Sequence, residues 1–375
     1  MGPGLRWLGL SERYVPIHIT AGDHTIPGPF YQASAEVPEL GAPGIGDIEL
    51  YNAMGVVANG MGNHEFDGDI NDFARMLERA KYPFIAANLD FRNVMVDPDA
   101  PEIEIGEDGA RRNKNNGKVV RSTHIQVADQ CIGLIGRAPA DFFNVIKDPD
   151  TTLPGLDFFG GRDPETNQPL VSAVEQVLDE VDRLEAQGID KIILIDHAQD
   201  FTGDPLSANK LRGIDVIVAA GTTGFMAKPQ AEGPFNLLRE GDTSEADYPV
   251  VREDMEGNDI LVVNSDQQYR YVGNLMVTFD ESGQVVDVDD RSGPVATTEE
   301  AIDLLAAELG RPQIKTPGRV KEIYEKLQQT PTIQDAFKVV GTTTSELNGF
   351  RADVRSRETN LGRVASDSTL WFTRQ

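Results

Sequence analysis

The chain has 375 residues, and at about 150 residues per domain this length predicts two units or one large domain with an appendage. Apolar residues make up 39% of the sequence, and 36 glycines and 22 prolines interrupt it, so we expect a packed, loop-rich fold and exclude disorder, collagen and coiled coil. The 61 acidic and 34 basic side chains give a net charge of −27, which would repel nucleic-acid polymers and anionic lipid.

The first third of the chain alternates strand and helix patterns. Residues 14–21 alternate apolar and polar side chains, which predicts a strand. Residues 46–54 and 70–80 have helical spacing, and residues 84–87 form a short apolar strand. Residues 102–128 contain an Asp-Gly turn and the polar run RRNKNNGK, so we expect a hairpin or a solvated insertion outside the alternation of strands and helices.

The later elements continue the alternation. Apolar side chains three and four apart make residues 170–187 the clearest helix of the chain. Helices at 298–309 and 318–329 are typical of a linker, and 341–375 has strand and helix signals but is too short for a domain. The pattern predicts an α/β (α+β) fold with one or two sheets. Its later strands are expected at 191–195, 215–219, 260–264, 271–279 and 285–288.

Three loops that follow predicted strands carry side chains that bind metal ions. Asp23 follows the first strand, Asn63 follows residues 56–58, and His197 follows residues 191–195. Ligands of α/β sheets gather outside the carboxyl ends of the strands. Carboxylate, amide and imidazole groups suit divalent ions. Each residue alone also fits a turn former or a strand-end histidine, but their joint placement predicts a metal site.

The string GNHEFD at residues 62–67 is the most specific motif in the chain. Gly62 permits a close approach, and Asn63 supplies an amide oxygen. His64 can donate a proton or polarise a bond, and Asp67 is placed to orient His64. The alternative is a helix N-terminus capped by Asn63, which accounts for the acidic residues but not for the histidine. We therefore favour a functional interpretation.

GNHEFD, with AGD at 21–23, resembles the calcineurin-like metallophosphoesterases, and in particular the 5'-nucleotidase and UDP-sugar hydrolase family. The resemblance spans nearly the whole chain, and GNHEFD and RETNLG are its specific motifs. It implies a two-sheet β-sandwich flanked by helices. The further matching segments are AANLD at 86–90, ILIDH at 193–197, DVIVAAG at 215–221, YRYVGNLMVTFD at 269–280 and RSRETNLGRVASDS at 355–368.

The resemblance also implies a division of the chain. Residues 1–295 would form a metallophosphoesterase domain that lacks its first strand, residues 296–340 a helical linker, and residues 341–375 the beginning of the C-terminal substrate domain. Arg355 in this last segment matches a family arginine that reaches the substrate phosphate. A solvated surface charge fits Arg355 equally well.

The resemblance implies roles for the other candidate residues. Asp23 would bridge two metal ions, and Asn63 and His197 would be ligands of one of them. His64 and Asp67 would stabilise the transferring phosphoryl group. The expected cofactors are divalent ions, Zn²⁺, Mn²⁺ or Mg²⁺.

Two ligand motifs of the family are missing from the sequence. Family members usually open with a strand that ends in Asp-x-His, which this chain lacks, and this suggests a truncation. They also carry Gly-His-x-His after the strand at 215–219, where Gly221 and Thr223 stand here. Similar small polar residues replace that motif in some branches of the family.

The ligand count favours one complete metal site. Asp23, Asn63 and His197 can hold one ion together with water. A second ion would have only the shared Asp23, unless His24 turns toward it, and a histidine in such a loop is more often exposed. The resemblance therefore implies one or two bound ions.

The leading functional hypothesis is a phosphoric monoester hydrolase of the 5'-nucleotidase type, which releases phosphate from nucleotides and acts in nucleotide catabolism. The alternatives are a cyclic-nucleotide or UDP-sugar phosphodiesterase and a non-catalytic, truncated form with a partial metal site. An acidic structural domain with chance motifs is a further alternative.

The expected partner is a nucleotide or another small phosphate ester. No transmembrane segment is predicted, because the longest apolar runs fall far short of about 20 residues. The N-terminus shows no signal peptide, whereas the resemblance implies an extracytoplasmic location, periplasmic or secreted. The acidic surplus would also suit a salt-rich habitat.

Overall fold

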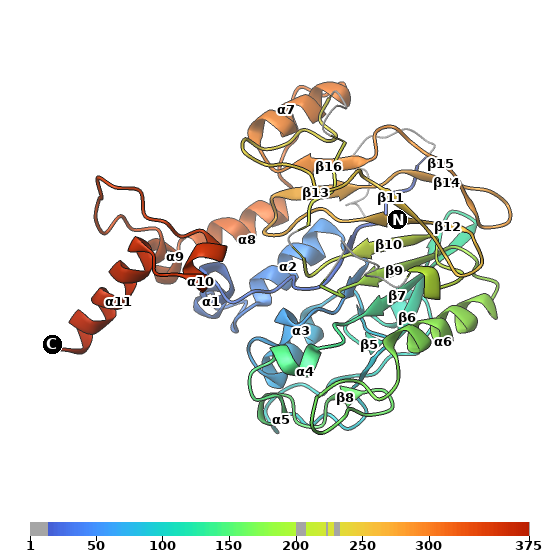
Figure 1. The fold of residues 1–375 in the computed structure, drawn as a ribbon, viewed down its shortest axis with the longest axis horizontal. Helices are drawn as coiled ribbons and strands as arrows, with labels where there is room; N and C mark the ends of the chain where they lie inside the picture. The colour runs from blue at the N-terminus through green and yellow to red at the C-terminus, as the bar shows by residue number, and fades with distance from the viewer. Residues whose placement is uncertain (1–13, 200–207, 223, 229–232, 375) are drawn as a thin grey trace. The chain divides into compact units, whose positions relative to one another are not determined.

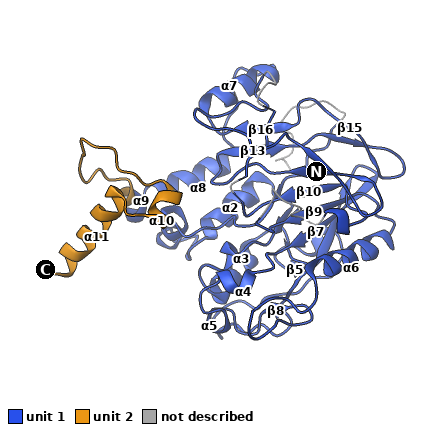
Figure 2. Cartoon of the chain, in the orientation of Figure 1, with its two compact units in different colours: residues 1–333 blue, residues 334–375 orange. Residues whose placement is uncertain are grey.

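The structure is a computed structural model, and it describes residues 14–199, 208–222, 224–228 and 233–374. The chain divides into two compact units, Met1–Ile333 and Gln334–Gln375 (Figure 2). The first unit contains both large sheets and all candidate site residues except Arg355.

A four-stranded parallel sheet forms one layer of the first unit (Figure 1). Parallel neighbours need crossover connections, and helices supply them between the first three strands. Along the sheet the strands are β1 (Ile19–Thr20), β2 (Ala58–Gly60), β3 (Phe84–Ile85) and β5 (Val119–Val120). The connecting helices are α1 (Pro29–Ala33), η2 (Ser34–Glu36), α2 (Ile45–Met54), η3 (His64–Phe66) and α3 (Ile70–Arg79).

A six-stranded mixed sheet forms the second layer. Its four inner strands run parallel, and the strand at each edge pairs antiparallel. In spatial order the strands are β11 (Val250–Glu253), β12 (Asp259–Val263), β10 (Val216–Ala219), β9 (Ile192–Asp196), β7 (Gln130–Arg137) and β6 (Ser122–Val127).

The two sheets pack face to face through apolar side chains. Ile85 of the first sheet lies in one buried cluster with Leu134 and Ile193 of the second. Helix α6 (Ala173–Glu185) covers the other face of the six-stranded sheet with Val177 and Val181, which have the helical spacing predicted from the sequence. The predicted two-sheet β-sandwich flanked by helices is confirmed.

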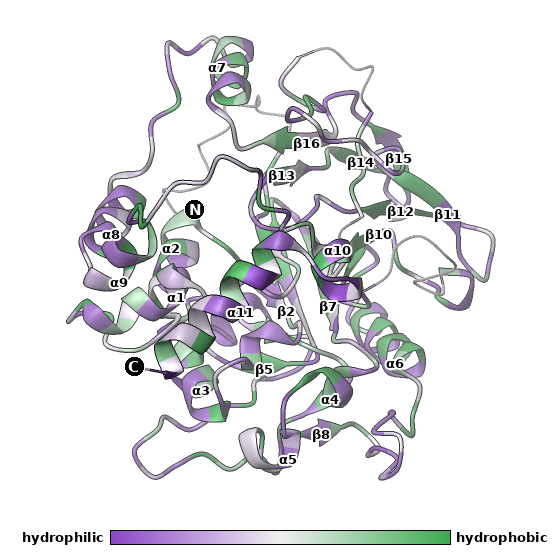
Figure 3. Ribbon diagram, turned by 60° about the vertical axis from the view of Figure 1, so that its left-hand side comes forward, coloured by the Kyte–Doolittle hydropathy of each residue, from purple (hydrophilic) through white to green (hydrophobic). Residues whose placement is uncertain are grey.

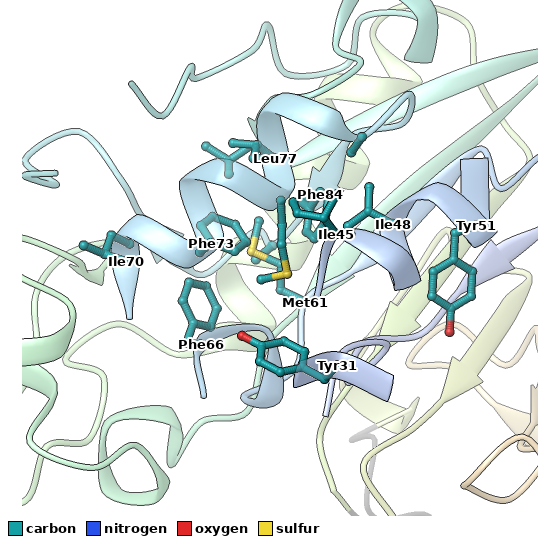
Figure 4. Close-up of a cluster of buried hydrophobic side chains, with 14 of the residues drawn as sticks. Tyr31, Ile45, Ile48, Tyr51, Met61, Phe66, Ile70, Phe73, Leu77 and Phe84 are labelled. Carbon is teal, nitrogen blue, oxygen red and sulfur yellow. The ribbon is translucent and has the colours of Figure 1, made fainter. Parts of the chain in front are cut away.

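Helices α2 and α3 cover the other face of the four-stranded sheet. Ile70, Phe73 and Leu77 line one side of α3 and are buried, and Figure 4 shows them in a cluster with Met61 and Phe66 from the loop after β2. Because Met61 and Phe66 are buried in this cluster, it holds the loop that carries GNHEFD in place.

The structure differs from the predicted elements in three places. Residues 102–128 are not an insertion outside the alternation of strands and helices, because they contain β5 and β6, one strand for each sheet. The predicted strand 271–279 is divided into β13 (Tyr271–Asn274) and β14 (Val277–Phe279), which pair with different partners. The expected strand 14–21 is reduced to β1.

The remaining elements of the first unit are short strands and peripheral helices. The two-stranded sheets pair β13 with β16 (Gly293–Ala296), β14 with β15 (Val285–Val288), and β4 (Leu89–Asp90) with β8 (Asp157–Phe158). The helices are η4 (Arg112–Lys114), α4 (Phe142–Val145), α5 (Pro149–Thr152), η5 (Ala208–Lys210), α7 (Glu299–Glu308) and α8 (Gly318–Gln328). Helix α9 (Pro331–Ala336) begins in this unit and ends in the second.

Helix α8, from the segment predicted as a linker, packs against α2. Its Ile323 and Leu327 are buried in the same cluster as the α2 side chains. A β-carbon at Gly46 of α2 would lie 3.1 Å from Leu327, so the two helices approach closely. The segment 296–340 therefore belongs, as far as Ile333, to the same compact unit as the sheets.

The second unit contains α10 (Arg351–Ser356) and α11 (Asn360–Thr373). Its described residues form no strand. Figure 3 shows hydrophobic stretches along α11, and Trp371 and Phe372 are exposed within this unit. In the part of the chain that the structure describes, we find no helix that is both long and apolar enough to span a membrane.

Candidate metal and phosphate site

The candidate site lies where loops from the two sheets meet. Asp23 follows β1 and Asn63 follows β2 in the four-stranded sheet, whereas His197 follows β9 and Gly221 follows β10 in the six-stranded sheet. All four strands run parallel to a neighbour, and their carboxyl ends carry these residues.

Asp23 and His197 are in direct contact. Nε2 of His197 lies 2.9 Å from Oδ2 of Asp23, and Oδ1 of Asp23 accepts the backbone N–H of His64 at 2.9 Å. Nδ1 of His197 lies 2.7 Å from the carbonyl oxygen of Ala21. Because a carbonyl can only accept, Nδ1 donates and Nε2 presents its lone pair to Asp23 in the neutral ring. Metal-binding histidines use this tautomer.

The Asp23–His197 pair favours a positive charge beside it. Burial lowers the pKa of His197, but the contact with the Asp23 carboxylate outweighs burial and raises the pKa overall. The same arrangement would attract a metal cation in place of the proton.

The surroundings of His197 fit a bound cation. Nε2 of His197 is buried without a hydrogen-bond partner, since its contact with Asp23 lacks hydrogen-bond geometry. A β-carbon at Gly62 would lie 2.2 Å from Oδ1 of Asp23 and 2.8 Å from Nε2 of His197. One at Gly221 would lie 2.8 Å from the same nitrogen. Glycine at these two positions lets the backbone approach the pair this closely, because a β-carbon would collide with it.

Asn63 adds an amide oxygen at the edge of this site. It is buried, and its Oδ1 accepts a hydrogen bond from Nε2 of Gln199 at 2.8 Å. A carbonyl oxygen has two lone pairs, so Oδ1 can keep this bond and still be a ligand. Gln199 has φ of 63°, a conformation that glycine adopts far more readily. Sequence reasoning did not identify Gln199.

The donor set suits one divalent cation. Asp23, Asn63 and His197 offer one carboxylate, one amide oxygen and one imidazole. Within residues 14–199, 208–222, 224–228 and 233–374, no group of three or more His, Cys, Asp or Glu side chains is placed to hold a metal. A metal site here therefore depends on an amide oxygen.

His64 and Asp67 form the predicted pair next to this donor set. Nδ1 of His64 contacts Oδ2 of Asp67. This hydrogen bond stabilises the protonated ring and raises the pKa of His64, although partial burial of the ring opposes the shift. Nδ1 is thus engaged, and Nε2 is the ring nitrogen left to act on a ligand.

Glu65, to which the sequence analysis gave no role in the site, connects the two loops. Its carboxylate accepts the backbone N–H groups of Asp23 at 3.1 Å, His24 at 3.1 Å and Gly62 at 2.8 Å, and the side-chain amide of Asn59 at 3.3 Å. Burial alone would raise the pKa of Glu65, but hydrogen bonds and the His24 charge lower it to about 2. The sequence feature that could have identified Glu65 is its position as an acidic residue inside the GNHEFD motif.

His24 is not the exposed loop residue that the sequence suggested, nor does it offer its ring to the site. It is 3% exposed, and its Nδ1 lies 2.6 Å from Oε1 of Glu65. Its ring packs at the edge of Tyr51 and beside Phe84. These aromatic neighbours are buried and enclose the His24 ring on the side away from Asp23, which explains why the ring is buried and not exposed.

Two other sequence candidates remain predictions. Thr223, which takes the place of a family histidine, lies outside the described residues. Arg355 belongs to α10 of the second unit, where its side chain is exposed. Its role toward a substrate phosphate stays a prediction.

Comparisons with known proteins agree with the motifs. No protein-family model matches the chain. The chain is 25% identical to the 5'-nucleotidase of Rattus norvegicus over 331 residues, which cover 87% of this chain and 47% of that protein. It is 27% identical to the 5'-nucleotidase of Diplobatis ommata over 85% of this chain and 45% of that protein. A snake venom 5'-nucleotidase of Naja atra is 25% identical over 86% of this chain and 51% of its own length. The chain thus spans about half the length of the curated relatives it matches.

The fold is similar to that of solved nucleotidases. The 5'-nucleotidase precursor from Thermus thermophilus matches with a TM-score of 0.70 and 25% identity, over 97% of this chain and 59% of that chain. The NAD nucleotidase of Haemophilus influenzae matches with a TM-score of 0.55 and 18% identity over 84% of this chain and 57% of that chain, a likeness of fold alone. Together with the sequence relatives, the Thermus structure supports the family that the motifs indicated, the calcineurin-like 5'-nucleotidases.

Proposed function

We propose that this chain is a metal-dependent phosphoric monoester hydrolase of the 5'-nucleotidase type, which releases phosphate from nucleotides. The observation that carries the proposal is the Asp23–His197 pair, whose Nε2 is buried without a hydrogen-bond partner close to Gly62 and Gly221. The His64–Asp67 pair lies on the adjoining loop. The curated relatives named 5'-nucleotidase support a nucleotide as the substrate.

Each side chain has a distinct part in this proposal. Asp23, Asn63 and His197 would hold the divalent cation, which when bound supplies positive charge for the phosphate and lowers the pKa of water. His64 would donate from Nε2 to a phosphoryl oxygen and so stabilise the charge that develops there. Asp67 would keep the His64 ring oriented and protonated, consistent with the raised pKa of His64.

The finer parts of the proposal concern the rest of the molecule. Arg355 would bind the substrate phosphate, and residues 341–375 would begin the C-terminal substrate domain. An extracytoplasmic location is supported by the relatives from snake venom.

Phosphate release from AMP tests the proposal directly. The purified chain is assayed with Mn²⁺, with Zn²⁺ and with EDTA, beside the variants Asp23→Asn and His64→Asn. We expect metal-dependent release, loss of activity in Asp23→Asn, and a decrease of about 10²–10⁴-fold in His64→Asn. His124→Asn is the matched control, because His124 lies on the edge strand β6 and contacts Gly109 instead. Equal rates in all variants would refute the assignment of the site.

A second candidate function is metal or phosphate binding without turnover. The single donor set of the described residues favours it. Calorimetric titration with Mn²⁺ distinguishes the two, because one equivalent per chain with no release of phosphate supports binding alone. Two equivalents with release support the hydrolase. Parallel assays with a cyclic nucleotide and UDP-glucose test the phosphodiesterase alternative.

A further inference from the structure

Glu65 is the link between the two loops that carry the donor set. Its carboxylate oxygen Oε2 accepts both the backbone N–H of Asp23 after β1 and that of Gly62 after β2. The conformation of Asp23 needs such support, because its φ is 53°, in the region that residues other than glycine seldom adopt. The position of the Asp23 carboxylate therefore depends on the position of Glu65.

His24 fixes Glu65 from the side away from the donor set. Its Nδ1 lies 2.6 Å from Oε1 of Glu65, and both side chains are almost completely buried. Its Nε2 lies 3.3 Å from the hydroxyl of Tyr82, and the ring packs 5.0 Å from the ring of Tyr51. The imidazole is thus enclosed by aromatic groups, with its polar edge turned to the carboxylate.

Tyr269 holds the same turn from a third loop. Its hydroxyl donates to the carbonyl oxygen of His24 at 3.0 Å and accepts from the hydroxyl of Tyr51 at 2.9 Å. Tyr269 follows β12, and its φ is 56°, close to those of Asp266 at 68° and Gln268 at 62°. A bulky residue in this region is strained, and such strain is found where the surroundings impose it.

Burial of the Tyr269 ring does not explain this strained position. The residue is 65% exposed, whereas its hydroxyl is engaged with two partners. The contacts that hold Tyr269 are therefore polar. Its hydroxyl bonds to His24, the residue next to Asp23, and to Tyr51, and Oγ1 of Thr297 donates to its backbone carbonyl at 2.7 Å.

We propose that His24 and Tyr269 are positioning residues that fix the Asp23 carboxylate beside His197, His24 through Glu65 and Tyr269 through the His24 carbonyl. The inference rests on the proposed metal centre, because Asp23 is its only carboxylate. His24 and Tyr269 act on Asp23 and are not themselves ligands. Groups that orient the ligands of a metal typically change its affinity 10- to 100-fold when they are removed.

A packing role for His24 makes the opposite prediction for two variants. His24→Asn places an amide nitrogen near the position of Nδ1 but leaves part of the ring volume empty. His24→Leu keeps apolar bulk among Tyr51 and Phe84 but offers Glu65 no donor. If packing is what matters, Leu is the better replacement, and if positioning is what matters, Asn is.

Cobalt binding provides a measurement that does not depend on activity. Co²⁺ is titrated into the full chain, and the visible absorption of the bound ion reports its coordination, at a temperature where circular dichroism shows each variant folded. The affinity is measured for wild type, His24→Asn, His24→Leu, Tyr269→Phe and Tyr269→Gly. Tyr324→Phe is the control, since it removes the hydroxyl of a half-exposed tyrosine on α8.

We expect His24→Leu to bind Co²⁺ at least tenfold more weakly with an altered spectrum, and His24→Asn to remain within about threefold of wild type. Tyr269→Phe should weaken binding about three- to tenfold. Tyr269→Gly should do the same without lowering the melting temperature, because glycine relieves the strained backbone.

Two results would overturn the inference. Binding that is weaker in His24→Asn than in His24→Leu would show a packing role. Unchanged affinity and spectrum in both Tyr269 variants would show that the tyrosine does not act on Asp23. If wild type itself binds no Co²⁺, the proposed metal centre is wrong. Equal binding by wild type and all the variants would instead refute the positioning roles and leave the metal centre in place.

Discussion

Two glycines, Gly62 and Gly221, let the backbone pack closely against Asp23 and His197. A β-carbon at Gly221, whose φ is +76°, would lie 2.8 Å from Nε2 of His197 and 2.7 Å from Cγ of Gln199. We expect Gly221→Ala to weaken Mn²⁺ binding at least tenfold in calorimetric titration, because the methyl group displaces the imidazole.

The control for this substitution is Gly257→Ala. Gly257 has φ of +85°, so alanine carries a similar backbone cost there, but nothing lies within 4 Å of its β-carbon. Both variants should lose comparable stability, and only Gly221→Ala should lose metal affinity. An equal loss of affinity in the two variants would attribute the effect to the backbone.

Asp215, at the start of the β10 segment, gives the chain a pH-dependent stability. Burial raises the pKa of Asp215 to about 7, although the backbone N–H of Ile192 donates to its carboxylate at 2.7 Å. The folded pKa lies above the unfolded value of 3.8, so between these values the folded state binds more protons. The stability from the protonated group is therefore complete below about pH 4 and is lost as pH rises through about 7.

Asp215→Asn should remove this pH dependence, because the amide stays neutral and still offers an oxygen to Ile192. Relative to wild type the variant gains about 3 kcal/mol of stability from pH 5 to pH 8, at about 1.4 kcal/mol for each pH unit between pH 5 and the folded pKa of about 7. Urea unfolding at the two pH values measures the difference. Asp179→Asn, whose side chain is 70% exposed, serves as the control and should show no such gain. A constant difference between Asp215→Asn and wild type would contradict the expectation.

At the residue scale, sequence reasoning found the side chains that follow strands and missed those that hold them. Asp23, Asn63 and His197 are recognisable because each has a metal-binding group at a strand end. Glu65 and Gln199 are not, because their partners are backbone N–H groups or side chains of loops distant in sequence. Such partners become visible only when the loops are folded together.

At the scale of elements, β7 and β9 are joined at their ends by a buried ion pair. Arg137 and Asp196 are opposite each other in the parallel register, and Nε and Nη2 of Arg137 each lie 2.7 Å from a different oxygen of Asp196. Asp196 immediately precedes His197. The pair therefore fixes the strand end from which His197 extends.

Arg137→Met should destabilise the fold by about 3–5 kcal/mol, because it leaves the Asp196 carboxylate buried without a counter-charge. Urea unfolding followed by circular dichroism measures the loss. Lys321→Met removes one partner of an exposed pair with Glu325 on α8 and should change stability by less than about 1 kcal/mol. Similar losses in the two variants would show that burial of the Arg137–Asp196 pair does not matter.

Element predictions succeeded where one periodicity dominated a segment. The helix around α6 and the strands β9 and β10 have uniform apolar patterns and were found close to their observed bounds. The segment 102–128 was misjudged because its polar run conceals two short strands, and each of them is defined by its neighbours in a different sheet. The break between β13 and β14 has a similar cause, since their partners β16 and β15 come later in the chain.

At the scale of the whole molecule, the net charge of −27 opposes the compact state. Like charges on one surface repel, and added salt screens exposed charges over a Debye length that falls from about 10 Å at 0.1 M to about 3 Å at 1 M. The acidic excess is spread over the sequence rather than confined to one segment. The repulsion among these acidic groups should therefore destabilise the whole folded protein, and this effect should weaken as the ionic strength rises.

We expect the melting temperature at pH 7.5 to rise by about 5 °C or more between roughly 0.1 M and 2 M NaCl, as relief of this repulsion adds a few kcal/mol. Differential scanning calorimetry measures the change. At pH 5, near the sequence pI of about 4.5, fewer carboxylates are charged and the rise should be smaller, which separates charge screening from a general effect of salt on apolar burial. A melting temperature that falls above about 1 M salt at pH 7.5 would show that repulsion between acidic groups does not limit the stability of this fold.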